Sequence, residues 1–124
     1  MSAPAASARP WPIELRLRKS ARLLEIDFDD GSSFALPAEL LRVESPSAEV
    51  QGHGSGQKKT VAGKRRVGIE RIEPVGTYAV RLVFSDGHDS GLFTWDYLRE
   101  LGETGDEKFA AYLKALEDKG LRRD

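Results

Sequence analysis

The chain has 124 residues, of which 40% are hydrophobic and 31% are charged, and its formal net charge is −1. This length is typical of one globular domain, and the near-neutral charge gives no general attraction to nucleic acid or to an anionic membrane. The absence of cysteine excludes disulfides, thiolate catalysis and zinc or iron–sulfur centres with cysteine ligands. No apolar run approaches the roughly 20 residues that a membrane-spanning helix needs.

The first eleven residues are rich in Ala, Ser and Pro and contain no continuous apolar stretch. This composition is not that of a secretory signal. We therefore expect residues 1–11 to be a disordered tail and the protein to be cytoplasmic.

Two segments of alternating apolar and polar residues, 13–17 and 24–28, predict strands that each bury one face. Asp30-Gly31 then supplies a turn with positive φ that closes a hairpin. A short third strand is expected to lead into a helix over residues 38–42, because a proline precedes this segment where the first helical turn tolerates it.

Residues 44–66 show no periodicity and are rich in glycine. They predict a long loop, and a loop of this length inside a small domain is more often functional than decorative.

Regular structure is expected to resume at residues 67–72, and the alternation over 80–84 leads into a second hairpin with its turn at Asp86-Gly87. Thr94 is a good N-cap for a short helix after that hairpin.

The last segment is predicted to be a separate amphipathic helix. Thr104 and Glu107 have the spacing of a capping box and mark its start, and Gly120 marks its end. Four residues are expected to share its apolar face, namely Phe109, Tyr112, Leu113 and Leu116.

One pattern occurs twice in the chain. Residues 28–31 read Phe-Asp-Asp-Gly and residues 84–87 read Phe-Ser-Asp-Gly, and each is followed by a short strand and a helical turn ending in Leu-Arg. The predicted fold class is therefore α+β, with a mainly antiparallel sheet built from two similar hairpin–helix halves and a C-terminal helix.

The second copy differs from the first at its turn, where His88, Asp89 and Ser90 replace two serines, Ser32 and Ser33. The scaffold of the turn does not require a protonatable group. The turn is therefore the first place to look for function.

Imidazole together with carboxylates suits Zn²⁺, Fe²⁺ or Mn²⁺. A metal site here would use His88 with Asp86 or Asp89, joined by His53 if the long loop folds against the turn. The alternative is structural: Asp86 and Ser90 hydrogen-bond the turn backbone and His88 is solvated beside them.

Three other patterns have simpler explanations. Ser90, His88 and Asp89 hold the residue types of a catalytic triad, but neighbours in an extended turn point to different sides, so no enzyme is expected. Trp95 and Tyr97 are expected to pack, one in the core and one on the sheet. A basic cluster lacks interleaved aromatic residues and predicts a solvated edge or a docking patch for an acidic protein rather than a nucleic-acid site; it comprises Lys58, Lys59, Lys64, Arg65 and Arg66.

Four segments carry a family resemblance: LRVESPSAEVQGHG at 41–54, VGTYAV at 75–80, DGHDSG at 86–91 and WDYL at 95–98. In this order they resemble the gamma-butyrobetaine hydroxylase-like N-terminal domain, which also occurs as small stand-alone bacterial proteins. The resemblance implies a domain over residues 12–102, followed by a C-terminal amphipathic helix and tail over 103–124.

In full-length hydroxylases, the resemblance implies, this domain precedes an oxygenase domain that depends on iron and 2-oxoglutarate. It also holds a structural zinc through three cysteines and one histidine. Here Ser45, Ser47 and Val50 stand at the cysteine positions and His88 stands at the histidine position. Hydroxyls are poor substitutes for thiolates and valine is no ligand, so this zinc site is not expected to assemble. The oxygenase iron motif has no match.

The domain also resembles one appended to some Mrp-type iron–sulfur carrier ATPases, which implies an accessory role near iron–sulfur assembly. We therefore expect a non-catalytic domain that binds an unknown protein partner, and neither a membrane nor nucleic acid. The expected partner surface comprises Ser45, Ser47, Glu49, His53, Asp86, His88 and Ser90. The competing hypothesis is a protein that binds iron or zinc through His88, His53, Asp86 and Asp89, and the third is a small enzyme of unknown reaction.

Overall fold

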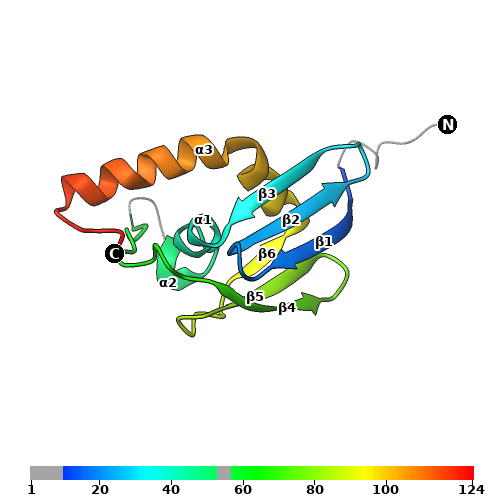
Figure 1. Ribbon diagram of the computed structural model, residues 1–124, viewed down its shortest axis with the longest axis horizontal. Helices are drawn as coiled ribbons and strands as arrows, with labels where there is room; N and C mark the ends of the chain where they lie inside the picture. Colours follow the sequence, from blue (N-terminus) through cyan, green and yellow to red (C-terminus); the bar gives the residue numbers. More distant parts are fainter. Residues whose placement is uncertain (1–9, 53–56) are drawn as a thin grey trace.

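The computed structural model describes residues 10–52 and 57–124. Its elements, shown in Figure 1, are β1 (Pro12–Arg18), β2 (Leu23–Phe28), β3 (Ser33–Pro37), α1 (Ala38–Val43), α2 (Ala48–Gln51), β4 (Ile69–Val75), β5 (Ala79–Phe84), β6 (Leu92–Thr94) and α3 (Trp95–Asp118). Within the described residues, no helix combines the length and the apolar character needed to cross a membrane.

The strands form two antiparallel sheets of three strands each, with β2 central in one and β5 central in the other. A helix follows the last strand of each sheet directly, α1 after β3 and α3 after β6. The predicted α+β fold with two similar hairpin–helix halves is therefore confirmed.

The alternation predicted for the central strands is present, since every second side chain of β2 and β5 is buried. These side chains join those of α1 and α3 in one hydrophobic cluster that both sheets share. Its fully buried members with the largest side chains include Phe28, Phe84, Phe93, Leu24 and Ile26. A second, smaller cluster joins α1, α2 and α3 and comprises Val43, Val50, Val61, Tyr112 and Leu116.

The two Asp-Gly turns have the same geometry. Gly31 has φ of 89° and Gly87 has φ of 91°, a region that glycine enters at little cost. In the first turn the N–H of Ser32 donates to Asp30 Oδ1 over 3.0 Å, and in the second the N–H of His88 donates to Asp86 Oδ1 over 3.1 Å. His88 therefore occupies the position of Ser32.

The prediction of a separate last helix was wrong, because α3 is continuous from Trp95 to Asp118. Its start at Thr94 was predicted correctly: the N–H of Tyr97 donates to the side-chain oxygen of Thr94 over 3.2 Å. Thr104 does not cap a helix. Its hydroxyl donates to the backbone oxygen of Glu100 over 2.8 Å, which satisfies it inside the helix.

One helix, α3, contributes to both hydrophobic clusters, and in Figure 1 it runs alongside β3. Tyr112 and Leu116 are buried as predicted, whereas Leu113 is 38% exposed, so it was wrongly assigned to the apolar face. Gly102 allows a close approach to β3, because a Cβ atom there would lie 2.6 Å from the ring of Phe34.

Trp95 and Tyr97 are both half-buried at the edge of the core, so neither enters it fully. Each donates a hydrogen bond to a backbone oxygen, from Trp95 Nε1 to Thr77 and from Tyr97 Oη to Glu44. The long loop predicted at 44–66 contains a short helix, α2, in its first part.

The second part of the loop lies against the C-terminal residues of the chain. The N–H groups of Gly63 and Arg65 donate to the backbone oxygens of Arg122 and Arg123, each over 2.9 Å. Lys119 Nζ donates to the hydroxyl of Thr60 over 2.9 Å. The loop and the C-terminal residues therefore form one continuous edge of the molecule.

Candidate functional site

His88 lies where the two halves of the fold meet. It follows the turn between β5 and β6, and its side chain points toward the segment between α1 and α2. Only 6% of the residue is exposed. The expectation that His88 is solvated was therefore wrong, because groups more than 40 positions earlier in the chain cover it.

Two serine hydroxyls meet one nitrogen of the His88 ring. Ser45 Oγ lies 2.9 Å and Ser47 Oγ 3.4 Å from Nε2, and the two hydroxyl oxygens are 3.3 Å apart. Ser45 is fully buried and Ser47 is 5% exposed. We call His88, Ser45 and Ser47 the His88 network. It gives hydrogen-bond partners to Nε2 and to both hydroxyls, which would otherwise be costly to bury.

Gly91 makes room for this network. A Cβ atom at Gly91 would lie 2.3 Å from Ser45 Oγ and 3.2 Å from Pro46 Cδ. Glycine is required here because a Cβ atom would clash with these neighbours. The backbone conformation does not require it, since φ of Gly91 is not positive.

The other ring nitrogen, Nδ1, is buried and has no hydrogen-bond partner among the described residues. The closest carboxylate oxygen, Glu49 Oε2, lies 3.8 Å away. Glu49 Oε1 accepts a hydrogen bond from the hydroxyl of Ser90 over 2.8 Å. Glu49 and Ser90 thus connect α2 to the turn on the exposed side of His88.

Burial lowers the pKa of His88 below its usual value, and the charge of Arg42 adds to this effect. The carboxylates of Glu49, Asp86 and Asp89 act in the opposite direction without outweighing it. The lowered pKa favours the neutral form of His88, in which one ring nitrogen carries a proton and the other can only accept.

Asp86 is held by two cations and by the turn. Arg42 Nε and Lys64 Nζ contact Asp86 Oδ2 at 2.8 and 2.6 Å, while Oδ1 accepts from the N–H of His88. Burial alone would raise the pKa of Asp86, but hydrogen bonds from Lys64, the His88 backbone and Arg42 hold it at about 2. Its carboxylate is ionised and its oxygens are already engaged.

Ser45, His88 and Glu49 follow one another as hydroxyl, imidazole and carboxylate, as in a hydrolase triad. A substrate, however, has no access to the hydroxyl. The nucleophile position, Ser45 Oγ, belongs to a residue with 0% exposure, and the distance from Nδ1 to Glu49 exceeds that of a hydrogen bond. A substrate carbonyl could not reach the hydroxyl. Ser90 donates its hydrogen bond to Glu49 and not to His88. The side chains of Ser90, His88 and Asp89, which have the residue types of a catalytic triad, therefore do not form one.

The predicted metal ligands do not come together in the described residues. Asp86 is occupied by cations, Asp89 is exposed, and His53 lies outside the residues that the structure describes. Over ranges 10–52 and 57–124, no group of three or more His, Asp or Glu side chains could hold a metal ion.

The residues at the zinc positions implied by the family resemblance do not fit zinc. Ser45 and Ser47 are neutral hydroxyls that hydrogen-bond His88 directly. Val50 is 1% exposed and belongs to the smaller hydrophobic cluster. One imidazole, two hydroxyls and an aliphatic side chain lack the thiolates or further imidazoles that a structural zinc needs. Hydrogen bonds take the place of metal–ligand bonds.

Two residues of the site were not singled out from the sequence, Arg42 and Lys64. Arg42 could have been found from the repeated Leu-Arg pair, whose second copy ends at Arg99. Lys64 was named only within the basic cluster, which was predicted to be a solvated edge or a docking patch for an acidic protein, yet its side chain is only 20% exposed and pairs with Asp86.

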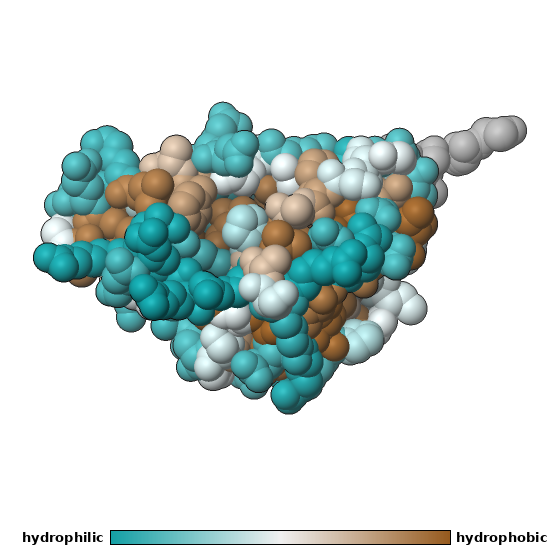
Figure 2. All heavy atoms as spheres, viewed as in Figure 1, coloured by the Kyte–Doolittle hydropathy of each residue, from teal (hydrophilic) through white to brown (hydrophobic). Residues whose placement is uncertain are grey.

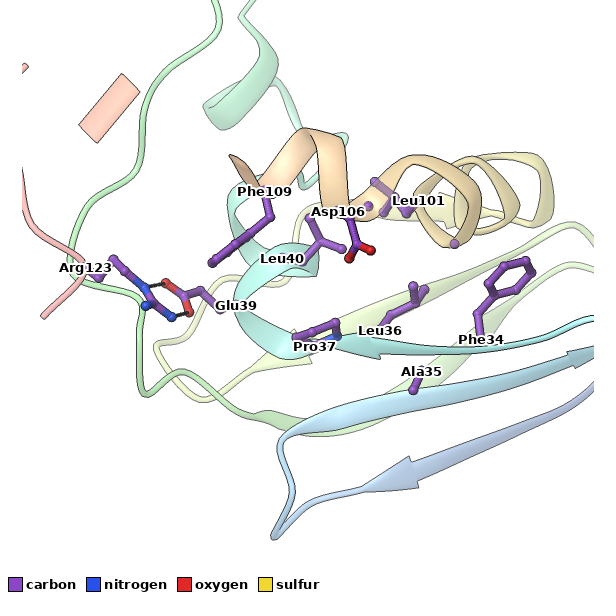
Figure 3. A pocket seen from close by; sticks show the side chains of 12 residues that line it. Phe34, Ala35, Leu36, Pro37, Glu39, Leu40, Leu101, Asp106, Phe109 and Arg123 are labelled. Carbon is purple, nitrogen blue, oxygen red and sulfur yellow. Dashed lines mark hydrogen bonds and ion pairs between the residues drawn. The ribbon is translucent and has the colours of Figure 1, made fainter. Parts of the chain in front are cut away.

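A separate apolar groove of about 250 Å³ lies between β3 and α3 (Figure 3). Phe34, Leu36, Leu40, Leu101 and Phe109 contribute its apolar lining. At one end, Arg123 and Glu39 form a two-pronged ion pair with distances of 3.0 and 2.7 Å. This pair fixes the C-terminal residues to the start of α1.

The chain matches the family model described as gamma-butyrobetaine hydroxylase-like, N-terminal, over residues 15–99. A protein known from an NMR solution structure is 48% identical, with a TM-score of 0.81 over 94% of this chain and 91% of that chain. A second NMR solution structure shows 45% identity and a TM-score of 0.81, covering 99% and 91%. A crystal structure of a protein with unknown function from Acidithiobacillus ferrooxidans shows 44% identity and a TM-score of 0.62, covering 73% and 91%. Comparison with curated proteins gave no match.

Proposed function

The chain belongs to the gamma-butyrobetaine hydroxylase-like N-terminal domain family, and we propose that it is a non-catalytic accessory domain that binds a protein partner. The proposed surface is the exposed rim above the His88 network, formed by Glu49, Asp89 and Ser90. The observation that supports it is the hydrogen bond of 2.8 Å between Ser90 and Glu49, which connects α2 to the β5–β6 turn directly over buried His88.

The His88 network supports a binding role because it gives this rim a fixed shape. A polar network that is buried and hydrogen-bonded specifies one arrangement of the segments that carry it. The hydrogen bonds from Ser45 and Ser47 to His88 connect the segment before α2 to the β5–β6 turn. The rim residues therefore project from two segments whose relative position is determined, as a recognition surface requires.

The class of partner follows from the resemblance to the domain appended to Mrp-type iron–sulfur carrier ATPases. By that analogy, the partner belongs to iron–sulfur assembly or to iron metabolism. The domain itself would contribute recognition rather than metal ligands.

Exposed residues make a better test than His88, because replacing a buried histidine would also lower the stability of the fold and so confuse a loss of binding with a loss of stability. Glu49→Lys with Asp89→Lys reverses two rim charges. A matched control, Glu107→Lys with Glu117→Lys, reverses two exposed acids of α3, a helix that contributes no residue to the rim. Chemical crosslinking in lysate of the source cells, followed by mass spectrometry, identifies the partner, and calorimetry with that purified partner gives the affinity.

We expect the rim variant to lose at least about tenfold in affinity while the control binds like the wild type. Equal binding by the wild type and the rim variant would place the surface elsewhere. The absence of any specifically crosslinked protein would argue against partner binding as the function.

A second candidate is metal binding through His88, favoured by one observation. His88 Nδ1 is buried without a hydrogen-bond partner among the described residues, and Glu49 Oε2 is 3.8 Å away. Imidazole nitrogen and carboxylate oxygen together suit zinc or iron. Elemental analysis after incubation with Fe²⁺ or Zn²⁺ and dialysis tests this candidate: about one equivalent that His88→Asn removes supports it, and no retained metal rejects it.

A further inference from the structure

The loop and the C-terminal residues form one strongly basic edge. Residues 57–66 carry five positive charges and no acid, and residues 119–124 carry three positive charges and one acid. Together these sixteen residues have a formal charge of +7, whereas the whole chain has −1, so the other 108 residues carry −8. The sequence places the two segments more than 50 positions apart, and only the fold joins them.

Hydrogen bonds and an ion pair hold the two segments side by side. Backbone N–H groups of Gly63 and Arg65 donate to Arg122 and Arg123. Arg123 in turn forms the ion pair with Glu39 that Figure 3 shows, and Tyr112 Oη donates to the backbone oxygen of Val61. In Figure 2 hydrophilic side chains lie beside apolar ones at the end of the molecule where Figure 1 places the C-terminus.

Some of these cations already have acidic partners from the fold. Lys58 pairs with Glu44 at 2.6 Å, and Arg65 lies 3.6 Å from Asp124. Four exposed cations, Lys59, Arg66, Lys119 and Arg122, have no carboxylate partner within the described part of the chain. A concentration of exposed charge of one sign raises the rate at which an oppositely charged partner associates.

We infer that this basic edge, defined as residues 57–66 with 119–124, binds an acidic segment of a protein. Two observations favour a carboxylate-bearing protein over nucleic acid. The first is that residues 57–66 and 119–124 contain no aromatic side chain that could stack on bases. The second is that two cations of this edge already bind carboxylates in short contacts, in the pairs Lys58–Glu44 and Arg123–Glu39.

This inference goes beyond the proposed function, since it concerns residues that do not belong to the rim of Glu49, Asp89 and Ser90. Either surface can therefore fail its test while the other passes. The basic edge needs a probe of defined chemistry, and no natural partner has to be known in advance.

The probe is a fluorescently labelled peptide of about twelve residues, mostly glutamate, whose binding is followed by anisotropy at about 50 mM salt. The test variant is Lys59→Glu with Arg122→Glu. The control variant, Arg71→Glu with Lys114→Glu, makes the same change in net charge at two exposed residues, one on β4 and one on α3 on the face away from buried Tyr112. A single-stranded oligonucleotide with the same number of charges is titrated in parallel.

We expect the wild type and the control variant to bind the peptide, and the test variant to bind at least about tenfold more weakly. Three results would overturn the inference: no binding by the wild type, an equal loss in the control variant, or tighter binding of the oligonucleotide than of the peptide. Association of this chain with a second copy, seen as a salt-dependent change of mass in light scattering that the test variant abolishes, would also overturn it in favour of self-assembly.

Discussion

Arg42 of the first half binds Asp86 of the second, with Nε 2.8 Å from Oδ2. Arg99 of the second half contacts Asp30 of the first in the same way, with Nη2 3.0 Å from Oδ2. Each arginine ends a repeated Leu-Arg pair, and each aspartate begins a repeated Asp-Gly turn. The repeat in the sequence therefore encodes a reciprocal exchange, in which each helix holds the turn of the other half.

The two arginine–aspartate contacts differ in burial, and this predicts different contributions to stability. The Arg42 side chain is 10% exposed, whereas Arg99 is 19% and Asp30 is 36% exposed. Removing one partner of a fully buried pair costs about 3–5 kcal/mol, and the partial exposure of Asp86 reduces this. We expect Arg42→Met to lower the free energy of unfolding by about 2 kcal/mol and Arg99→Met by clearly less. Urea unfolding with an unchanged slope is the measurement, and equal losses would contradict the prediction.

Titration of His88 predicts a loss of stability in mild acid. The folded state lowers the pKa of His88 through burial and the charge of Arg42, so the unfolded chain binds more protons near pH 6. Stability then rises with pH in this range and is lost as pH falls below the ordinary histidine value. We expect the urea midpoint to decrease from about pH 7.5 to about pH 5.5.

His88→Gln should flatten this pH dependence, because glutamine does not titrate. The chain has two histidines, so His53→Gln is the matched control and should keep the wild-type decrease. If the decrease persists in His88→Gln and disappears in His53→Gln, the pH dependence comes from His53 and the prediction is wrong.

Much of the fold could be predicted because its signals are local. Alternation defined the central strands, and Asp-Gly fixed two turns that only glycine adopts without strain. The start of α3 followed from Thr94, but its continuity did not. Thr104 resembles an N-cap in the sequence, and only its hydrogen bond to Glu100 shows that it lies inside a continuous helix.

The candidate site could be predicted only in part, because its burial comes from contacts between distant segments. The turn chemistry drew attention to His88, and the family resemblance implied that Ser45 and Ser47 lie close to it, but neither showed that the two hydroxyls contact Nε2 and bury the ring. The +7 edge likewise depends on where the C-terminal residues lie, so the sequence revealed only the cluster at 58–66. Local patterns predict elements, whereas the meeting of polar side chains depends on how the elements pack.

The position of Gly91 predicts a specific steric effect. A Cβ atom there would lie 2.3 Å from Ser45 Oγ, so Gly91→Ala should displace Ser45 from His88 and lower the free energy of unfolding by about 1–3 kcal/mol. In the double variant with Ser45→Ala, the hydroxyl that causes the clash is absent. The combined loss should therefore be smaller than the sum of the two single losses, as a double-mutant cycle can show. Strict additivity would mean that the two residues do not interact.

The family resemblance implies that Ser45, Ser47 and His88 stand at three of the four positions of a structural zinc site, and the distances around His88 Nε2 predict that two substitutions would restore zinc binding. In a tetrahedral centre with Zn–S of about 2.3 Å and Zn–N of about 2.0 Å, the ligand atoms are roughly 3.5–3.8 Å apart. The two serine oxygens and Nε2 are already 2.9–3.4 Å apart, and the longer C–S bond together with a small outward shift would bring sulfur to those separations. Ser45→Cys with Ser47→Cys should thus bind Zn²⁺ through two thiolates and His88, with water as a fourth ligand.

Zinc uptake by this variant can be measured by competition with a chromophoric chelator, and Co²⁺ substitution gives a thiolate charge-transfer band as an independent readout. The expected result is about one equivalent of tightly held metal, with the affinity falling at low pH because the thiols must lose their protons. Adding His88→Asn should remove most of the affinity while leaving both cysteines in place. If the triple variant binds as tightly as the double one, the imidazole is not a ligand, and the distances at His88 would not describe a site able to coordinate metal.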